Sequence, residues 1–257
     1  MRFIILFGLL ASAAVQAQEA AIELPRLIEQ RQFQAKPGSM PSGAGLSPMI
    51  LPVTVIAFDV TFHERRVQDD LDLFNAIFAP CAIQLGSVPV RIFNSEGRPL
   101  TYKGNGFGSA SWADARWGQL QRAVMDEGIV ATYLSYNDRG KGPIPQELGS
   151  SQNLEREGVS WRTDELKARA LATFPKYAFY LTDCRHSLVA PLHEYADCVP
   201  VFSHEAGHIL FSEGHNEQSG NLMFGFKKAA GPTRRSGATA VTADQCAKAR
   251  KFIEKIR

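Results

Sequence analysis

Residues 204–208 set the strongest constraint on the fold, because their side chains can act together only if the segment is helical. The segment reads HEAGH and lies within 201–212, a largely apolar stretch that we expect to form a helix. Residues four apart lie on one face of a helix, so His204 and His208 can bind one metal ion. Zn²⁺ suits imidazole ligands in a site that keeps one position open. Glu205 lies beside them and can take a proton from water, which predicts a catalytic site for one Zn²⁺ ion.

A third candidate ligand, His215, follows His204 by eleven residues. In a continuous helix it would lie about 16 Å further along the axis, beyond the reach of a shared metal ion. The chain must therefore turn back first. Gly214 immediately precedes His215 and can adopt the left-handed conformation that ends a helix. This turn would let His215 complete a site of three imidazoles, with water as the fourth ligand.

The first residues predict export from the cell. Residues 1–17 combine a positive charge, an apolar run at 3–10 and small residues before a cleavage point, which is the pattern of a secretory signal peptide. The apolar run is too short to span a bilayer. Residues 18–50 are expected to be a linker or pro-segment, since 36–47 is rich in Gly, Pro and Ser. We expect a periplasmic or secreted protein with no membrane insertion after removal of the signal.

The charge balance excludes a typical nucleic-acid-binding surface. Lys and Arg number 28 against 26 Asp and Glu, a net charge of +2, whereas nucleic-acid-binding domains are usually strongly basic. The chain has 257 residues, 45% of them hydrophobic and 21% charged. It is therefore long enough to bury a sizeable globular core, and we expect no nucleic-acid partner.

Four cysteines, Cys81, Cys184, Cys198 and Cys246, are expected to form two disulfides in an exported chain. Three pairings are possible. If Cys184 and Cys198 close a short loop, Cys81 and Cys246 remain to tie an early helix to the last one. No C-x-x-C occurs, which argues against zinc ligation by these residues.

Alternating apolar runs and helical periods predict a mixed α/β (α+β) fold. The expected strands are 51–60, 83–93, 128–136 and 177–182. The expected helices are 64–78, 113–126, 163–173, 201–212 and 242–256.

Individual residues refine these expectations. Pro80 should end the first helix, and Pro89 indicates that the second strand lies at a sheet edge or carries a bulge. Residues 137–160 are polar and contain Gly and Pro, which predicts a long surface loop. Thr242 and Gln245 have the spacing of a capping box at the start of the last helix.

The H-E-x-x-H motif, the nearby third His and a downstream Met resemble the metzincin clan of zinc metallopeptidases. The usual pattern of that clan is H-E-x-x-H-x-x-G-x-x-H followed by a Met-turn. Met223, in the sequence NLM at 221–223, matches the Met-turn. Gln245 and Cys246, with Arg250 nearby, also resemble bacterial members of the clan.

The chain departs from this pattern in two places. Phe211 occupies the position of the clan's glycine, and His215 comes one residue late. A helix that is one residue longer, with Gly214 making the turn, would reconcile both departures.

The resemblance implies a twisted mixed β-sheet with packed helices and an active-site helix at the floor of a cleft. The catalytic domain would span 51–257, with an N-terminal subdomain to about 214 and a C-terminal subdomain at 215–257. The function implied is that of an exported zinc-dependent endopeptidase acting on peptides or proteins. His204, His208 and His215 would hold the zinc ion and Glu205 would be the general base.

Two alternatives remain open. In a gluzincin-like hydrolase a Glu from a later helix supplies the third ligand, and Glu254 is the candidate. The chain could also be an exported zinc-binding protein without catalysis, although structural zinc sites need no general base beside them. The sequence does not predict an oligomeric state.

Overall fold

The computed structural model of the chain describes residues 24–39, 45–95, 120, 123, 128–134, 149–153, 165, 168, 175–182, 200–224 and 239–257. In these residues the elements are β1 (Leu27–Gln34), β2 (Met49–Ile50), β3 (Val53–Phe58), α1 (Glu64–Phe78), η1 (Ala79–Cys81), β4 (Ile83–Gln84), β5 (Ser87–Phe93), β6 (Ile129–Leu134), β7 (Gly149–Asn153), β8 (Tyr177–Thr182), α4 (Val201–Phe211) and α5 (Ala243–Ile256). The fold is mixed α/β, as the sequence predicted.

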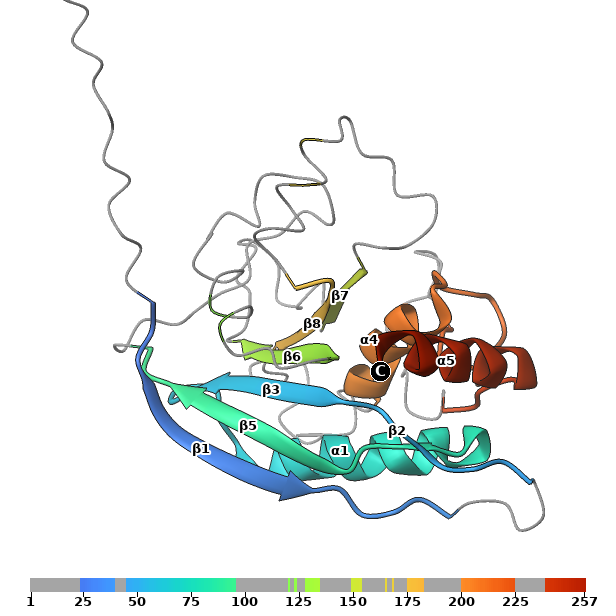
Figure 1. Cartoon of the computed structure of the whole chain (residues 1–257), viewed down its shortest axis with the longest axis horizontal. Helices are drawn as coiled ribbons and strands as arrows, with labels where there is room; N and C mark the ends of the chain where they lie inside the picture. The colour runs from blue at the N-terminus through green and yellow to red at the C-terminus, as the bar shows by residue number, and fades with distance from the viewer. Residues whose placement is uncertain are drawn as a thin grey trace, which may run out of the picture.

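The six-stranded sheet has the order β1-β5-β3-β6-β8-β7 (Figure 1). The four inner strands are parallel to one another, and the two edge strands, β1 and β7, are antiparallel to their neighbours. β3 is buried along its whole length, which explains why all of its residues except Thr54 are apolar. A separate parallel pair joins β2 to β4.

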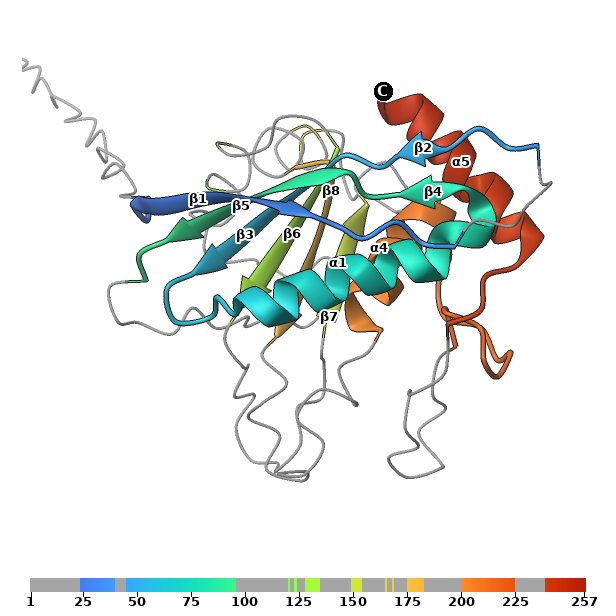
Figure 2. The same ribbon diagram turned by 90° about the horizontal axis from the view of Figure 1, so that it is seen from below.

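Helices α1 and α4 cover the same face of the sheet (Figure 2). The apolar stripe of α1, with Leu71 and Phe74, packs on alternate residues of the strands, such as Val55 in β3 and Phe179 in β8. The opposite face buries a smaller cluster in which Ile56 and Phe58 participate. The helix that carries the HEAGH segment is thus an integral part of the main core.

Three predicted strands and three predicted helices are confirmed, and β8 matches its predicted range. The single strand predicted at 83–93 is instead two strands, β4 and β5, which lie in different sheets. Two further expectations are wrong. Residues 149–153 form β7 inside the predicted loop 137–160, because they pair with β8 although they contain no apolar residue. Pro89 lies in β5, an inner strand, but the pairing of β5 with β3 begins only at Val90, so the missing N–H of Pro89 costs that pairing nothing.

Part of the expected linker or pro-segment is also a strand. β1 lies within 18–50 and pairs with β5, from Leu27 opposite Phe93 to Gln34 opposite Ser87. The predicted signal peptide lies outside the described residues, as do most of the helices expected at 113–126 and 163–173. Among the described residues no helix has the length and hydropathy needed to cross a membrane.

A disulfide between Cys81 and Cys246 connects η1 to α5 across 165 residues of sequence. This is one of the pairings that the sequence left open, and Cys184 and Cys198 lie outside the described residues. The predicted capping box is confirmed: the Thr242 hydroxyl accepts from Gln245 N, and Gln245 Oε1 accepts from Thr242 N. The start of α5 is therefore fixed both covalently and by its cap.

Asp70 of α1 is buried between the helix and the sheet. Its Oδ2 accepts a hydrogen bond of 2.7 Å from Tyr133 Oη, and Arg66 Nε lies 3.8 Å away, with its guanidinium over the Tyr133 ring. Burial raises the pKa of Asp70 from 3.8 to about 6, against the opposing effects of Arg66 and the Tyr133 hydrogen bond. The carboxyl group is thus protonated in the folded protein at a pH where it is ionised in the unfolded chain.

This pKa shift predicts a loss of stability as the pH rises. The folded state binds a proton that the unfolded state lacks between the unfolded pKa of 3.8 and the folded pKa of about 6. The protonated Asp70 therefore stabilises the fold fully below pH 3.8, and this stabilisation is lost as the pH rises through about 6. Relative to Asp70→Asn, which keeps an oxygen for Tyr133, we expect wild-type unfolding free energy to fall by about 2 kcal/mol from pH 4 to 7. Urea unfolding of both proteins across this range measures the difference, and parallel curves would contradict the assignment.

Candidate metal centre

The helix α4 is apolar around most of its circumference, and all but one of its residues are buried. Phe202 anchors it by edge contacts with Phe74 of α1 and Phe179 of β8, with ring centroids 6.1 and 4.9 Å apart. This packing holds His204 and His208 one helical turn apart in a fixed position. Their ring centroids are 4.7 Å apart, as the four-residue spacing predicts.

The helix ends at Phe211, and its C-cap Ser212 has the left-handed conformation at φ 55° and donates its N–H to Ile209 O. Gly214 does not have a positive φ, so the prediction that it makes the turn is wrong. Phe211 packs on Phe78 with ring centroids 5.9 Å apart, and this contact keeps residue 211 within the helix. The left-handed residue therefore comes one position later than the glycine of the H-E-x-x-H-x-x-G-x-x-H pattern. It still precedes His215 by three residues, which explains the one-residue delay of the third His.

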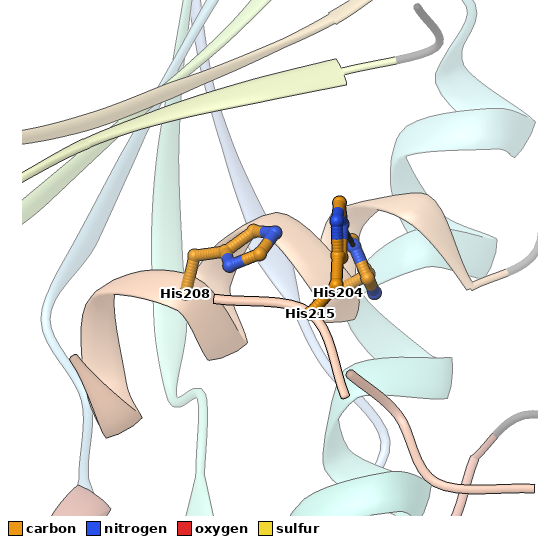
Figure 3. Close-up of side chains that lie close together, drawn as sticks. All are labelled: His204, His208 and His215. Carbon is orange, nitrogen blue, oxygen red and sulfur yellow. Dashed lines mark hydrogen bonds between the residues drawn. The ribbon is translucent and has the colours of Figure 1, made fainter. Parts of the chain in front are cut away.

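After this turn His215 returns to the other two histidines (Figure 3). One ring nitrogen from each of His204, His208 and His215 lies within 4.8 Å of the others. The Nε2 atoms of His204 and His215 are 3.0 Å apart. His204 is buried, His208 partly buried and His215 exposed. The cluster is thus open to solvent on the side of His215.

Two backbone carbonyls fix the orientation of the helical histidines. His204 Nδ1 lies 2.6 Å from Leu222 O, and His208 Nδ1 lies 2.8 Å from Glu213 O. A carbonyl oxygen only accepts, so Nδ1 carries the proton in both rings. In the neutral rings each Nε2 is then unprotonated, which is the form that binds a metal ion.

Met223 lies beneath α4. It is fully buried, and a Cβ atom added to Gly207 would come within 2.7 Å of its Sδ atom. Gly207 is therefore the residue that lets the segment 221–223 approach the helix closely enough for Leu222 O to reach His204.

Glu205 is 5% exposed, on α4 directly after His204. Glu254, the alternative third ligand, lies on the exposed side of α5 and is not part of the cluster that could hold a metal ion. Among the described residues that cluster consists of the three predicted histidines. The sequence did not identify the carbonyls of Leu222 and Glu213, since every residue type carries one.

The donor set fits Zn²⁺. Zinc binds imidazole nitrogens at about 2.0–2.1 Å, so two nitrogens of a tetrahedral site lie roughly 3.3 Å apart. The 3.0 Å between the Nε2 atoms of His204 and His215 is close to that value. Three imidazole nitrogens with one exposed side leave a position for a fourth ligand, whereas structural zinc sites have four protein ligands.

No family model matches the chain, and no curated protein sequence matches it. Among solved structures, the chain is similar to metalloproteinase-II from Bacteroides fragilis, with a TM-score of 0.45 and 14% sequence identity. The similarity covers 86% of this chain and 58% of that chain, so it spans less than two thirds of the length of that metalloproteinase. A likeness this distant does not assign a function.

Proposed function

We propose that this chain is an exported, zinc-dependent endopeptidase of metzincin type. The observation that carries the proposal is the convergence of His204, His208 and His215, with the buried Glu205 on the same helix. The three imidazoles would hold the zinc ion. When bound in such a site, Zn²⁺ acts as a Lewis acid toward water and toward a substrate carbonyl group.

Glu205 has the role of general base in this proposal. Its carboxylate accepts a proton from the attacking water and then delivers it to the amine that leaves when the peptide bond breaks. Its burial on α4 keeps the group in a fixed place and limits competing solvent. The backbone carbonyls of Leu222 and Glu213 keep the imidazoles in the tautomer that leaves Nε2 unprotonated.

A peptide substrate suits the position of β7. Among the described strands β7 is at one edge of the sheet, and it lies against α4. An extended peptide can pair with an edge strand through main-chain hydrogen bonds. Such pairing would bring a peptide bond next to the helix that carries the histidines.

The disulfide between Cys81 and Cys246 supports the proposal of export, since structural disulfides persist mainly in oxidising compartments. Export by a signal peptide at residues 1–17 and a periplasmic or secreted location remain part of the proposal. A non-catalytic zinc-binding role is less well supported, because the histidine cluster is exposed at His215 and a carboxylate lies beside it.

The proposal is tested with the mature chain, purified without chelator. We expect about one equivalent of zinc by mass spectrometry, and cleavage of internal bonds in a diverse peptide mixture. Treatment with a chelator should abolish both, and addition of Zn²⁺ should restore both. Zinc binding without any cleavage would favour the non-catalytic alternative, and a protein that binds no zinc would refute the metal site.

A further inference from the structure

Two buried side-chain amides lie between α5 and the loop that follows α4. Asn221 is 1% exposed and Gln245 is 3% exposed. Asn221 Nδ2 donates to Gln245 Oε1 over 2.9 Å, and Gln245 Nε2 donates to Asn221 Oδ1 over 3.2 Å. The two amides therefore form a reciprocal pair, here called the amide pair.

Backbone groups fix which way both amides face. Met223 N donates to Asn221 Oδ1, and Thr242 N donates to Gln245 Oε1. A backbone N–H must face an oxygen, so neither amide can be turned around without losing a buried hydrogen bond. Asn216 Nδ2 also donates to Asn221 Oδ1. Leaving a buried donor or acceptor unpaired is unfavourable, so the amide pair is held in one arrangement.

The amide pair contacts both ends of the loop 213–222, where the two orienting carbonyls lie. Asn221 directly precedes Leu222, whose carbonyl accepts from His204 Nδ1. Gln245 Nε2 lies 3.3 Å from Oε2 of Glu213, whose carbonyl accepts from His208 Nδ1. Lys248, one turn further along α5, holds the other carboxylate oxygen of Glu213. The first two turns of α5 thus hold the loop near both of the carbonyls that orient His204 and His208.

We infer that Asn221 and Gln245 are positioning residues of the metal centre: through Leu222 O and Glu213 O they set the orientation of His204 and His208. This inference rests on the proposed function for the presence of a metal ion. Outer partners of metal-bound histidines typically change metal affinity 10- to 100-fold when they are altered. The amide pair acts one step further out, through the backbone that carries those partners.

Gln245→Glu tests the inference with almost no change of shape. The new carboxylate still accepts from Thr242 N and Asn221 Nδ2, so the helix cap remains. It cannot donate to Asn221 Oδ1 or to Glu213 Oε2, and it places like charges side by side. We expect the Kd for Zn²⁺, measured by competition with a chromophoric chelator, to rise about tenfold or more. The absorption spectrum of the Co²⁺-substituted protein should shift, and kcat should fall with little change in KM.

Lys251→Gln, an exposed substitution on the same helix, is the matched control. Asn221→Asp is a second variant that keeps the oxygen for Met223 N but loses the donor to Gln245. Thermal unfolding in excess chelator reports the stability of each metal-free protein. If the amide pair is purely structural, the two substitutions lower that stability but leave the Kd and the Co²⁺ spectrum at the values of the control. This result would overturn the inference. Failure of both variants to fold would do the same.

These outcomes are distinct from failure of the proposed function. If the wild type binds no metal, the proposed function itself fails. If the wild type binds zinc and cleaves peptides but the variants match the control, only the inference fails.

Discussion

Glu205→Gln is expected to retain zinc and to lose peptide hydrolysis. General-base catalysis contributes about 100- to 10,000-fold to a reaction rate, so we expect kcat to fall by about a thousandfold. The amide has the same shape as the carboxylate but cannot accept a proton at neutral pH. The three imidazoles are untouched, so the zinc content measured by mass spectrometry should equal that of the wild type.

The control is Glu217→Gln, the same substitution at an exposed position on the loop after His215. It should cleave the peptide mixture at the wild-type rate. If Glu205→Gln cleaves as fast as this control at equal zinc content, another group is the base and the proposed mechanism is wrong. If Glu205→Gln loses zinc, its low activity does not report on proton transfer, and assays are compared after Zn²⁺ is added back.

His215→Ala is expected to weaken metal binding strongly, because it removes one of the three proposed ligands. We expect the Kd for Zn²⁺ to rise more than about 100-fold, beyond the usual effect of residues outside the coordination sphere. Glu254→Ala should bind zinc like the wild type, since Glu254 is exposed and lies outside the histidine cluster. Chelator competition on both variants measures the two constants under one set of conditions.

The reverse result would support the gluzincin-like alternative, in which Glu254 is the third ligand. His215 is exposed, so its replacement should leave the metal-free fold intact. Equal thermal unfolding of the two variants in chelator would show that the difference in affinity comes from ligation.

The inner part of the sheet could be predicted from the sequence, and its edges could not. β3 and β8 are short apolar runs buried on both sides, so their burial is visible in their residue types. β7 reads GSSQN, and its strand conformation comes from pairing with β8. β1 buries one side chain, Phe33, and leaves the apolar Leu27 and Ile28 exposed. At such edges tertiary pairing decides the conformation, and local composition does not record it.

The three histidines of the candidate site could be predicted from the sequence, but the position of the turn between His208 and His215 could not. The spacing of His204 and His208 fixes their relation on any helix, whereas the end of the helix depends on tertiary contacts. Gly214 is the residue whose intrinsic preference suits a left-handed turn, yet burial of Phe211 against Phe78 places that turn at Ser212. The pairing of Gln245 with Asn221 could not be predicted from the sequence either, because the two residues are 24 positions apart.

The order in which a ribosome makes the chain gives the position of α5 a further meaning. The sheet strands and all three histidines precede α5, but the residue that pairs with Asn221 and the cysteine that pairs with Cys81 are neighbours within it. Ala249 and Ile253 of α5 also belong to the main core, so a chain that lacks α5 can complete neither the core nor the contacts that hold the loop 213–222. The last residues to be made therefore complete both the core and the surroundings of the histidine cluster.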